Sequence, residues 1–167
     1  MGTLILAACG GGGATAEEWR TIRGEGYAAR VPAGWELERP PRTVAAANPD
    51  GPETVSIGVF RLSKPFDAAL WSEAVAELND VAARLAERLS PTARVERSRD
   101  GILQGRRGRF YEIRYRRDDV ELVDRVVFLL VDTREYQLTC RIAVAEPGPG
   151  TEACAELHRS FRLRPPP

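Results

Sequence analysis

The residues of this chain that could perform thiol, acid–base or metal chemistry are three cysteines and a single histidine, His158. A serine–histidine–aspartate triad would have to use His158. This residue stands beside Arg159 in a short predicted helix, off the apolar face that carries Cys154 and Phe161, which favours an exposed surface histidine. One histidine also excludes zinc sites built on several histidines. We therefore expect no catalytic residues, no metal and no cofactor.

Two of the cysteines, Cys140 and Cys154, are predicted to face one another. Cys140 belongs to a segment in which every second residue from Tyr136 to Val144 is apolar or cysteine, as in a half-buried strand. Cys154, Leu157 and Phe161 share one face of the short helix that follows. A disulfide between strand and helix is expected, and closing a loop of about 15 residues would contribute roughly 3 kcal/mol. Two buried free thiols are the alternative.

The third cysteine, Cys9, follows the apolar run Leu4-Ile5-Leu6-Ala7-Ala8 and precedes four glycines. This arrangement resembles a bacterial lipobox, in which the cysteine thiol carries a diacylglycerol. Residues 1–9 are then a truncated lipoprotein signal peptide, without the basic region such peptides begin with, so the true start codon is expected upstream. Glycines suit a flexible tether better than a strand. The alternative is a buried free cysteine in an apolar strand.

Charge excludes one class of function and raises one surface hypothesis. Lys+Arg and Asp+Glu number 24 each, and a chain of zero net charge has no global field to attract nucleic acid. The basic residues concentrate at one place, around Arg107, Arg109, Arg114 and Arg116. They could form a strip that contacts anionic headgroups or a cell-wall polymer. The alternative is a solvated sheet face whose arginines pair across strands with Glu121 and Asp124.

Hydrophobic periodicity predicts an α+β fold. One long helix is expected between Pro65 and Ser90, with apolar residues on a single stripe and Asp67 near its amino-terminal cap. Short strands precede it: one from Tyr27 up to the turn Pro32-Ala33-Gly34, one that opens at Trp35 and stops before Pro40, and two more over 43–47 and 54–62. The segments after it, over 94–99, 107–116, 120–131 and 136–144, are joined by polar turns and indicate an antiparallel meander, with turns at 99–101 and at Asp118-Asp119. We expect an antiparallel sheet of about six strands or more, on which the long helix and a short carboxy-terminal helix pack.

The order of these elements resembles the PsbP-like superfamily, and within it the bacterial lipoproteins of PsbP-like or DcrB-like fold. The residues that carry the resemblance are Tyr27, Val31, Pro32, Gly34 and Trp35, the strand 136–140, and Cys154 with Ser160-Phe161. The resemblance implies a central antiparallel sheet with helices on it and no shared catalytic residue set. The chain then divides into signal peptide 1–9, tether 10–24, one PsbP-like domain over 25–163 and a disordered tail 164–167.

These observations lead to one functional expectation with two alternatives. The expectation is a non-catalytic binding or assembly module, anchored through Cys9 on the extracytoplasmic face of the cell membrane, monomeric by default, with an envelope protein or cell-wall polymer as its partner. The first alternative is a carrier of a small apolar ligand in a cavity between the long helix and the sheet. The second is an envelope hydrolase, for which the sequence shows no cluster of acids.

Overall fold

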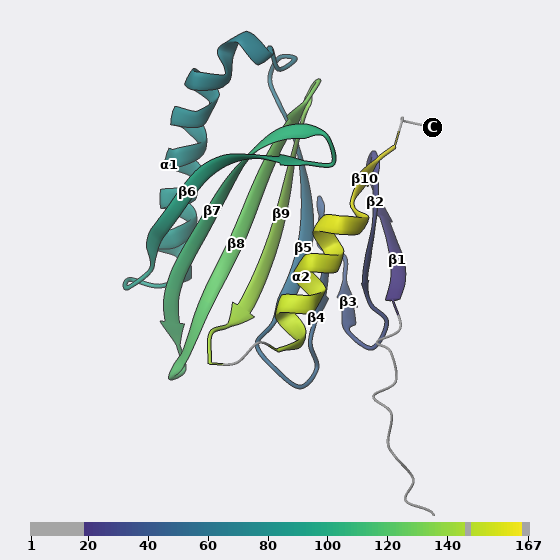
Figure 1. Ribbon diagram of the computed structural model, residues 1–167, viewed down its shortest axis with the longest axis vertical. Helices are drawn as coiled ribbons and strands as arrows, with labels where there is room; N and C mark the ends of the chain where they lie inside the picture. Colours follow the sequence, from purple (N-terminus) through teal and green to yellow (C-terminus); the bar gives the residue numbers. More distant parts are fainter. Residues whose placement is uncertain (1–18, 146–147, 165–167) are drawn as a thin grey trace, which may run out of the picture.

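A computed structural model describes residues 19–145 and 148–164 of the protein (Figure 1). Cys9, the predicted signal peptide and most of the predicted tether lie outside this range. The strands before the long helix are β1 (Trp19–Gly24), β2 (Tyr27–Pro32), β3 (Glu36–Glu38), β4 (Thr43–Ala47) and β5 (Thr54–Arg61). The remaining elements are η1 (Ala68–Leu70), α1 (Trp71–Leu89), β6 (Arg94–Leu103), β7 (Arg106–Arg117), β8 (Val120–Val131), β9 (Arg134–Ala143), α2 (Pro149–Ser160) and β10 (Arg162–Leu163).

The predicted fold class is confirmed: the described strands form antiparallel sheets with a long and a short helix packed on them. A 7-stranded sheet has the order β3-β4-β5-β9-β8-β7-β6, and a 3-stranded sheet has the order β1-β2-β10. Tight turns link the consecutive strands of the meander, and the residues in these turns adopt positive φ. Asp118 and Asp119 have φ of 49° and 63°, as the central residues of a two-residue hairpin loop require.

The large sheet separates two apolar cores. The helix α1 covers one face, where Leu78, Ala82 and Ala86 pack with Tyr111 and Phe128. The helix α2 covers the opposite face, where Leu157 and Phe161 join a second core with Leu138, Tyr136 and Val127. Alternation along each strand explains the division, since successive side chains point to opposite faces. In Figure 1 α1 lies behind β6 and β7, and α2 crosses in front of β9 and β5.

The long helix ends where the sequence predicts, but α1 begins at Trp71, after the short 3-10 turn η1, and not close to Pro65. Asp67 caps the turn that precedes it, because its Oδ1 accepts a hydrogen bond of 2.9 Å from the backbone N–H of Ala69. The helix ends at Leu89, and Ser90 follows in an extended conformation ahead of Pro91. No helix in the described part of the chain is long and apolar enough to cross a membrane.

Three sequence predictions about boundaries are wrong. Residues 19–24 are not tether: they form β1, paired residue by residue with β2. The hairpin turn between β6 and β7 lies at Gln104-Gly105, both at positive φ, and not at 99–101. Arg164 is not part of a disordered tail, because its N–H donates to the carbonyl of Gly26 at 2.8 Å. In each case a polar, arginine-rich segment is held to a neighbouring strand by backbone hydrogen bonds, and the pattern of apolar side chains does not predict such pairing.

Candidate functional site

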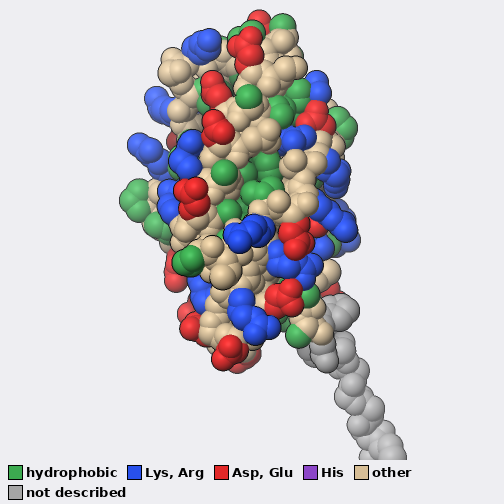
Figure 2. Space-filling view, turned by 90° about the vertical axis from the view of Figure 1, so that its left-hand side faces the viewer, with side chains coloured by type: hydrophobic (Ala, Val, Ile, Leu, Met, Phe, Trp, Pro, Cys, Tyr) green, Lys and Arg blue, Asp and Glu red, His purple; other side chains and the backbone are tan. Residues whose placement is uncertain are grey.

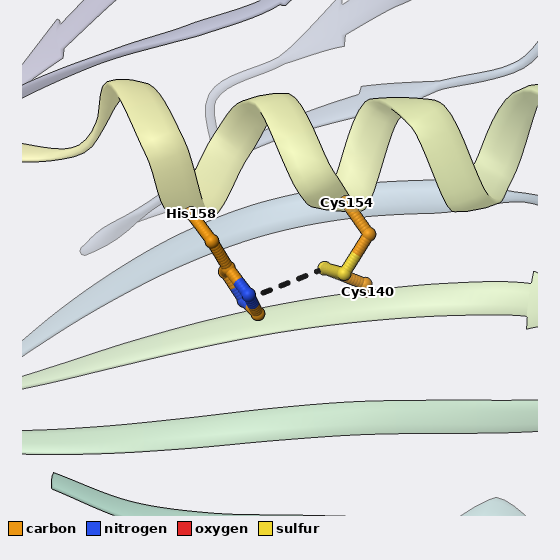
Figure 3. A group of neighbouring side chains, drawn as sticks. All are labelled: Cys140, Cys154 and His158. Atoms are coloured by element: carbon orange, nitrogen blue, oxygen red, sulfur yellow. Dashed lines mark hydrogen bonds between the residues drawn. A yellow bond between two sulfur atoms is a disulfide. The ribbon is translucent and has the colours of Figure 1, made fainter. Parts of the chain in front are cut away.

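The cysteine pair and the histidine meet between β9 and α2. Cys140 lies on the α2-facing side of β9, and its Sγ is bonded to Sγ of Cys154 across a Cα–Cα distance of 5.6 Å. His158 stands one helical turn after Cys154, and its Nε2 lies 3.9 Å from Sγ of Cys140. Figure 3 shows both α2 side chains pointing down onto β9. The prediction of an exposed surface histidine is therefore wrong: positions i and i+4 of a helix share a face.

The surroundings of His158 hold its imidazole neutral. Burial lowers the pKa of His158 to about 4, and the positive charge of Arg125 on the neighbouring strand adds to the effect. Arg125 is the cross-strand partner of Cys140 in the β8–β9 register. A neutral imidazole can donate or accept a hydrogen bond or bind a metal ion, and it is a poor general acid at neutral pH.

Protein stability should fall below pH 6.5 because of His158. Its pKa in the folded chain lies below the ordinary value of 6.5, so the unfolded state binds the extra proton first. The free energy of unfolding is at its full value above pH 6.5 and decreases as pH falls toward about 4, by about 3 kcal/mol in total for this residue. Urea unfolding of wild type and His158→Gln at a series of pH values measures it. The free energy of unfolding should fall more steeply with decreasing pH in wild type than in His158→Gln. This difference reports His158 alone, because both proteins contain the same carboxylates. Parallel curves would contradict the assignment.

A groove opens beside this cluster, on the α2 side of the sheet. Its volume is about 750 Å³, and its walls come from β6, β7 and β8 on one side and from α2 on the other. Phe110, Val127 and Cys154 contribute apolar surface, while Ala155 and His158 lie along the helix. The tip of the β6–β7 hairpin contacts the end of α2, because the side-chain amide of Gln104 donates to the carbonyls of His158 and Arg159, each at 2.9 Å.

Charged side chains of both signs line the strand wall of the groove. Arg97, Arg99 and Arg125 lie among the lining residues with Glu96 and Glu112, which leaves one cation in excess. Glu112 is 3.9 Å from Arg97 and 3.3 Å from Arg125. The Arg99 guanidinium lies 4.7 Å from the centre of the Phe110 ring. The groove therefore combines an apolar floor with a polar wall that is slightly basic, which suits binding better than acid–base catalysis.

The four arginines predicted as one basic strip point to opposite faces of the sheet. Arg107 and Arg109 lie on the α1 side: Arg107 stacks 4.6 Å from the Trp71 ring centre, and both pair with Asp100. Arg114 and Arg116 alternate to the other face.

Arg114 is ion-paired at 2.6 Å with Glu121, the cross-strand partner that the alternative interpretation named. Figure 2, which faces the α1 side, shows cations and acids interspersed. The four residues therefore cannot contact one flat surface together.

The groove could not be read from the sequence. Its walls combine β6 with α2, which lie more than 50 residues apart in sequence. Most residues of β6 are polar and exposed, so this strand shows no alternation of apolar side chains that would identify its inward face. The position of His158 did have a signal, the spacing of four residues from Cys154. Buried Glu156, which pairs with Arg30 and Arg159 and ties α2 to β2, was also missed.

Comparison with known proteins gives likenesses of structure only. No protein-family model matches the chain, and no curated protein matches it in sequence. The solution structure of cyanobacterial PsbP (CyanoP) from Synechocystis is 16% identical, with a TM-score of 0.64, covering 95% of this chain and 98% of that one. LpqN, involved in cell envelope biogenesis of Mycobacterium tuberculosis, is 13% identical, with a TM-score of 0.54, covering 89% and 91%.

A crystal structure from Bacteroides thetaiotaomicron is similar over part of its length. It is 10% identical with a TM-score of 0.57, and 87% of this chain matches 48% of that one. The chain thus spans about half the length of that protein. CyanoP and LpqN, in contrast, are matched along nearly their whole length. The domain described by residues 19–164 therefore has a PsbP-like fold.

Proposed function

We propose that this protein is an extracytoplasmic, lipid-anchored binding or assembly module without catalytic activity of its own, and that it engages its partner through the groove beside α2. The main support for this binding function is the groove. Its volume of about 750 Å³, its apolar floor and its mixed charges provide a binding surface, and its only imidazole, at His158, has a pKa of about 4. An anionic segment of an envelope protein or a cell-wall polymer fits the excess of arginine over glutamate in the wall.

Three further observations support an envelope location. The sequence Leu6-Ala7-Ala8-Cys9 has the form of a lipobox, and a diacylated cysteine binds a membrane stably. LpqN, which shares the fold, is described as involved in cell envelope biogenesis. A disulfide between Cys140 and Cys154 is the kind of bond that persists outside the reducing cytosol.

The groove also bears on the alternative of an apolar carrier. That alternative placed the ligand between the long helix and the sheet, where Leu78, Ala82 and Phe128 pack together and a hollow of about 140 Å³ lies beside the start of α1 and Leu130. The groove of about 750 Å³ lies on the opposite face, and five of its lining residues are charged. We therefore favour a polar or charged partner over a small apolar ligand.

The anchor and compartment are tested by expressing the protein from its full upstream gene region. Intact-mass analysis of the membrane fraction should find a mature chain that begins at Cys9, carries a diacylglycerol, and gains two hydrogens on reduction. Cys9→Ser should move the protein out of the membrane fraction. A soluble, unacylated and fully reduced protein would reject the anchor and the compartment together.

The groove is tested separately, by photocrosslinking in intact cells. A photoreactive residue at Ala155, exposed in the groove wall, should give a discrete adduct, whereas the same residue at Ala83, exposed on α1 across the sheet, should not. Arg125→Glu reverses a cation in the wall and should lower the yield from position 155. Equal adducts from positions 83 and 155, or no effect of Arg125→Glu, would contradict binding in the groove.

A further inference from the structure

The disulfide and His158 form a set of donor atoms that the proposed binding function does not use. The sulfur atoms of Cys140 and Cys154 and a ring nitrogen of His158 all lie within 4.8 Å of one another. Thiolate and imidazole are ligands that zinc and similar ions prefer. His158 and Cys154, the latter only 3% exposed, also line the groove, so the groove is the side from which an ion would approach them.

The spacing of these atoms is close to that of a metal centre. Zinc binds thiolate at about 2.3 Å and imidazole at about 2.0 Å, so tetrahedral neighbours lie about 3.5 to 3.8 Å apart. His158 Nε2 is already 3.9 Å from Sγ of Cys140. Once the bond between the sulfurs is broken, they need to separate only to about 3.8 Å. Rotations of two short side chains on Cα atoms 5.6 Å apart can provide this movement.

We propose that reduction of the Cys140–Cys154 disulfide creates a binding site for one zinc-like ion, held by Cys140, Cys154 and His158, with its fourth coordination position facing the groove. The fold fixes two ligands on consecutive turns of α2 and the third on β9 (Figure 3). Two thiolates balance the charge of a divalent ion, so the complex remains neutral beside Arg125. The proposal is independent of what the groove binds.

Outside the cytosol the disulfide persists until a dithiol reduces it, so the metal-binding state requires such a reductant, either a small molecule or a thioredoxin-like protein. Its thiolate attacks Sγ of Cys154, the cysteine that lines the groove, and forms a mixed disulfide. Cys140 leaves as a thiolate on the strand beside Arg125, its partner in the β8–β9 register, whose guanidinium also pairs with Glu112 at 3.3 Å.

The second thiol of the reductant then displaces Cys154. The dithiol is oxidised to a disulfide, and its two electrons and two protons pass to the protein cysteines. Binding of a divalent ion to the two thiols finally releases two protons.

Titration with Co²⁺, a spectroscopic substitute for Zn²⁺, tests the proposal on the folded protein. The chain is reduced with dithiothreitol and desalted without oxygen, and near-ultraviolet circular dichroism is recorded before and after Co²⁺. We expect one Co²⁺ per reduced chain, with a thiolate-to-cobalt charge-transfer band that Zn²⁺ abolishes, and no such band for the oxidised chain. His158→Gln should weaken binding at least about tenfold.

Thr151→Ala is the matched control, because Thr151 lines the groove from α2 but lies outside the donor set. It should bind Co²⁺ as tightly as wild type. Unchanged affinity in His158→Gln would overturn the site, as would equal binding by the oxidised chain. A reduced chain that loses its circular dichroism signal and does not regain it with Co²⁺ would overturn it as well. None of these outcomes depends on the photocrosslinking result.

Discussion

Asp124→Ala should destabilise the protein by about 3 kcal/mol or more, through the loss of a buried ion pair. Asp124 is 3% exposed and lies within β8 on the α1 face of the sheet. Its two carboxylate oxygens accept hydrogen bonds from Nε and Nη2 of Arg141, each at 3.1 Å, and one of them also accepts from the Tyr115 hydroxyl at 2.8 Å. Removing the carboxylate leaves the guanidinium of Arg141 without its partner in a largely desolvated position. Urea unfolding at neutral pH measures the change in free energy.

Two variants separate this ion pair from an ordinary surface contact. Glu121→Ala removes the ion-pair partner of Arg114. The side chains of Glu121 and Arg114 are 45% and 39% exposed, so this variant should lower the free energy of unfolding by less than about 1 kcal/mol. The double variant Asp124→Ala, Arg141→Met should regain part of the stability lost in Asp124→Ala, because no buried charge is then unpaired. A loss for Asp124→Ala no greater than that for Glu121→Ala would contradict this account.

The ion pair between Asp124 and Arg141 shows why the alternation of a strand predicts the fold better than it predicts the partners of charged residues. Alternation identifies β8 and β9 as half-buried strands, and the sequence predicts both. It cannot say that Asp124 points inward, because polar residues are normally assigned to the exposed face. The sequence interpretation accordingly offered Asp124 as a surface partner for the arginines of β7. Its true partner, Arg141, is the residue directly opposite on β9, and identifying it requires the register.

The termini of the domain show the limit of side-chain patterns in another way. Strands β1 and β10 border β2 and hold it through backbone hydrogen bonds, yet only Ile22 of β1 is buried and β10 is two residues long. Neither has an alternation long enough to predict a strand. The long helix, in contrast, has a stop at Ser90-Pro91 and a continuous apolar stripe, and Asp67 caps the turn that leads into it, so its existence, its buried face and its end are predictable from the sequence.

The candidate site was predictable in part. The faces of Cys140 and Cys154 follow from a period of two and a period of 3.6, and their bond is present in the structure. The same helical period places His158 near Cys154, but His158 stands beside Arg159 and off the face assigned to Cys154 and Phe161, which favours a surface position. The groove depends on the contact of Gln104 with the end of α2, 54 residues away in sequence, and no local pattern encodes it.

Phe161→Ala should destabilise the protein by about 3 to 5 kcal/mol, because it empties a buried site where three elements meet. Phe161 is 1% exposed and follows α2 directly. Its ring centre lies 6.1 Å from that of Tyr27 on β2 and 6.0 Å from that of Tyr136 on β9. The side chain therefore joins the 3-stranded sheet, the end of α2 and the large sheet. Thermal and urea unfolding should both report the loss.

The consequence should extend to the groove, because α2 forms one of its walls. Loss of the Phe161 contact frees the end of α2 that Gln104 meets, so photocrosslinking from Ala155 should decrease in Phe161→Ala even where the protein remains folded. Ile102→Ala is the control: Ile102 is 68% exposed near the tip of the β6–β7 hairpin, and its removal should change stability by less than about 0.5 kcal/mol. If both variants behaved alike, Phe161 would not be what positions α2, and the groove would owe its shape to the disulfide and the Gln104 contact alone.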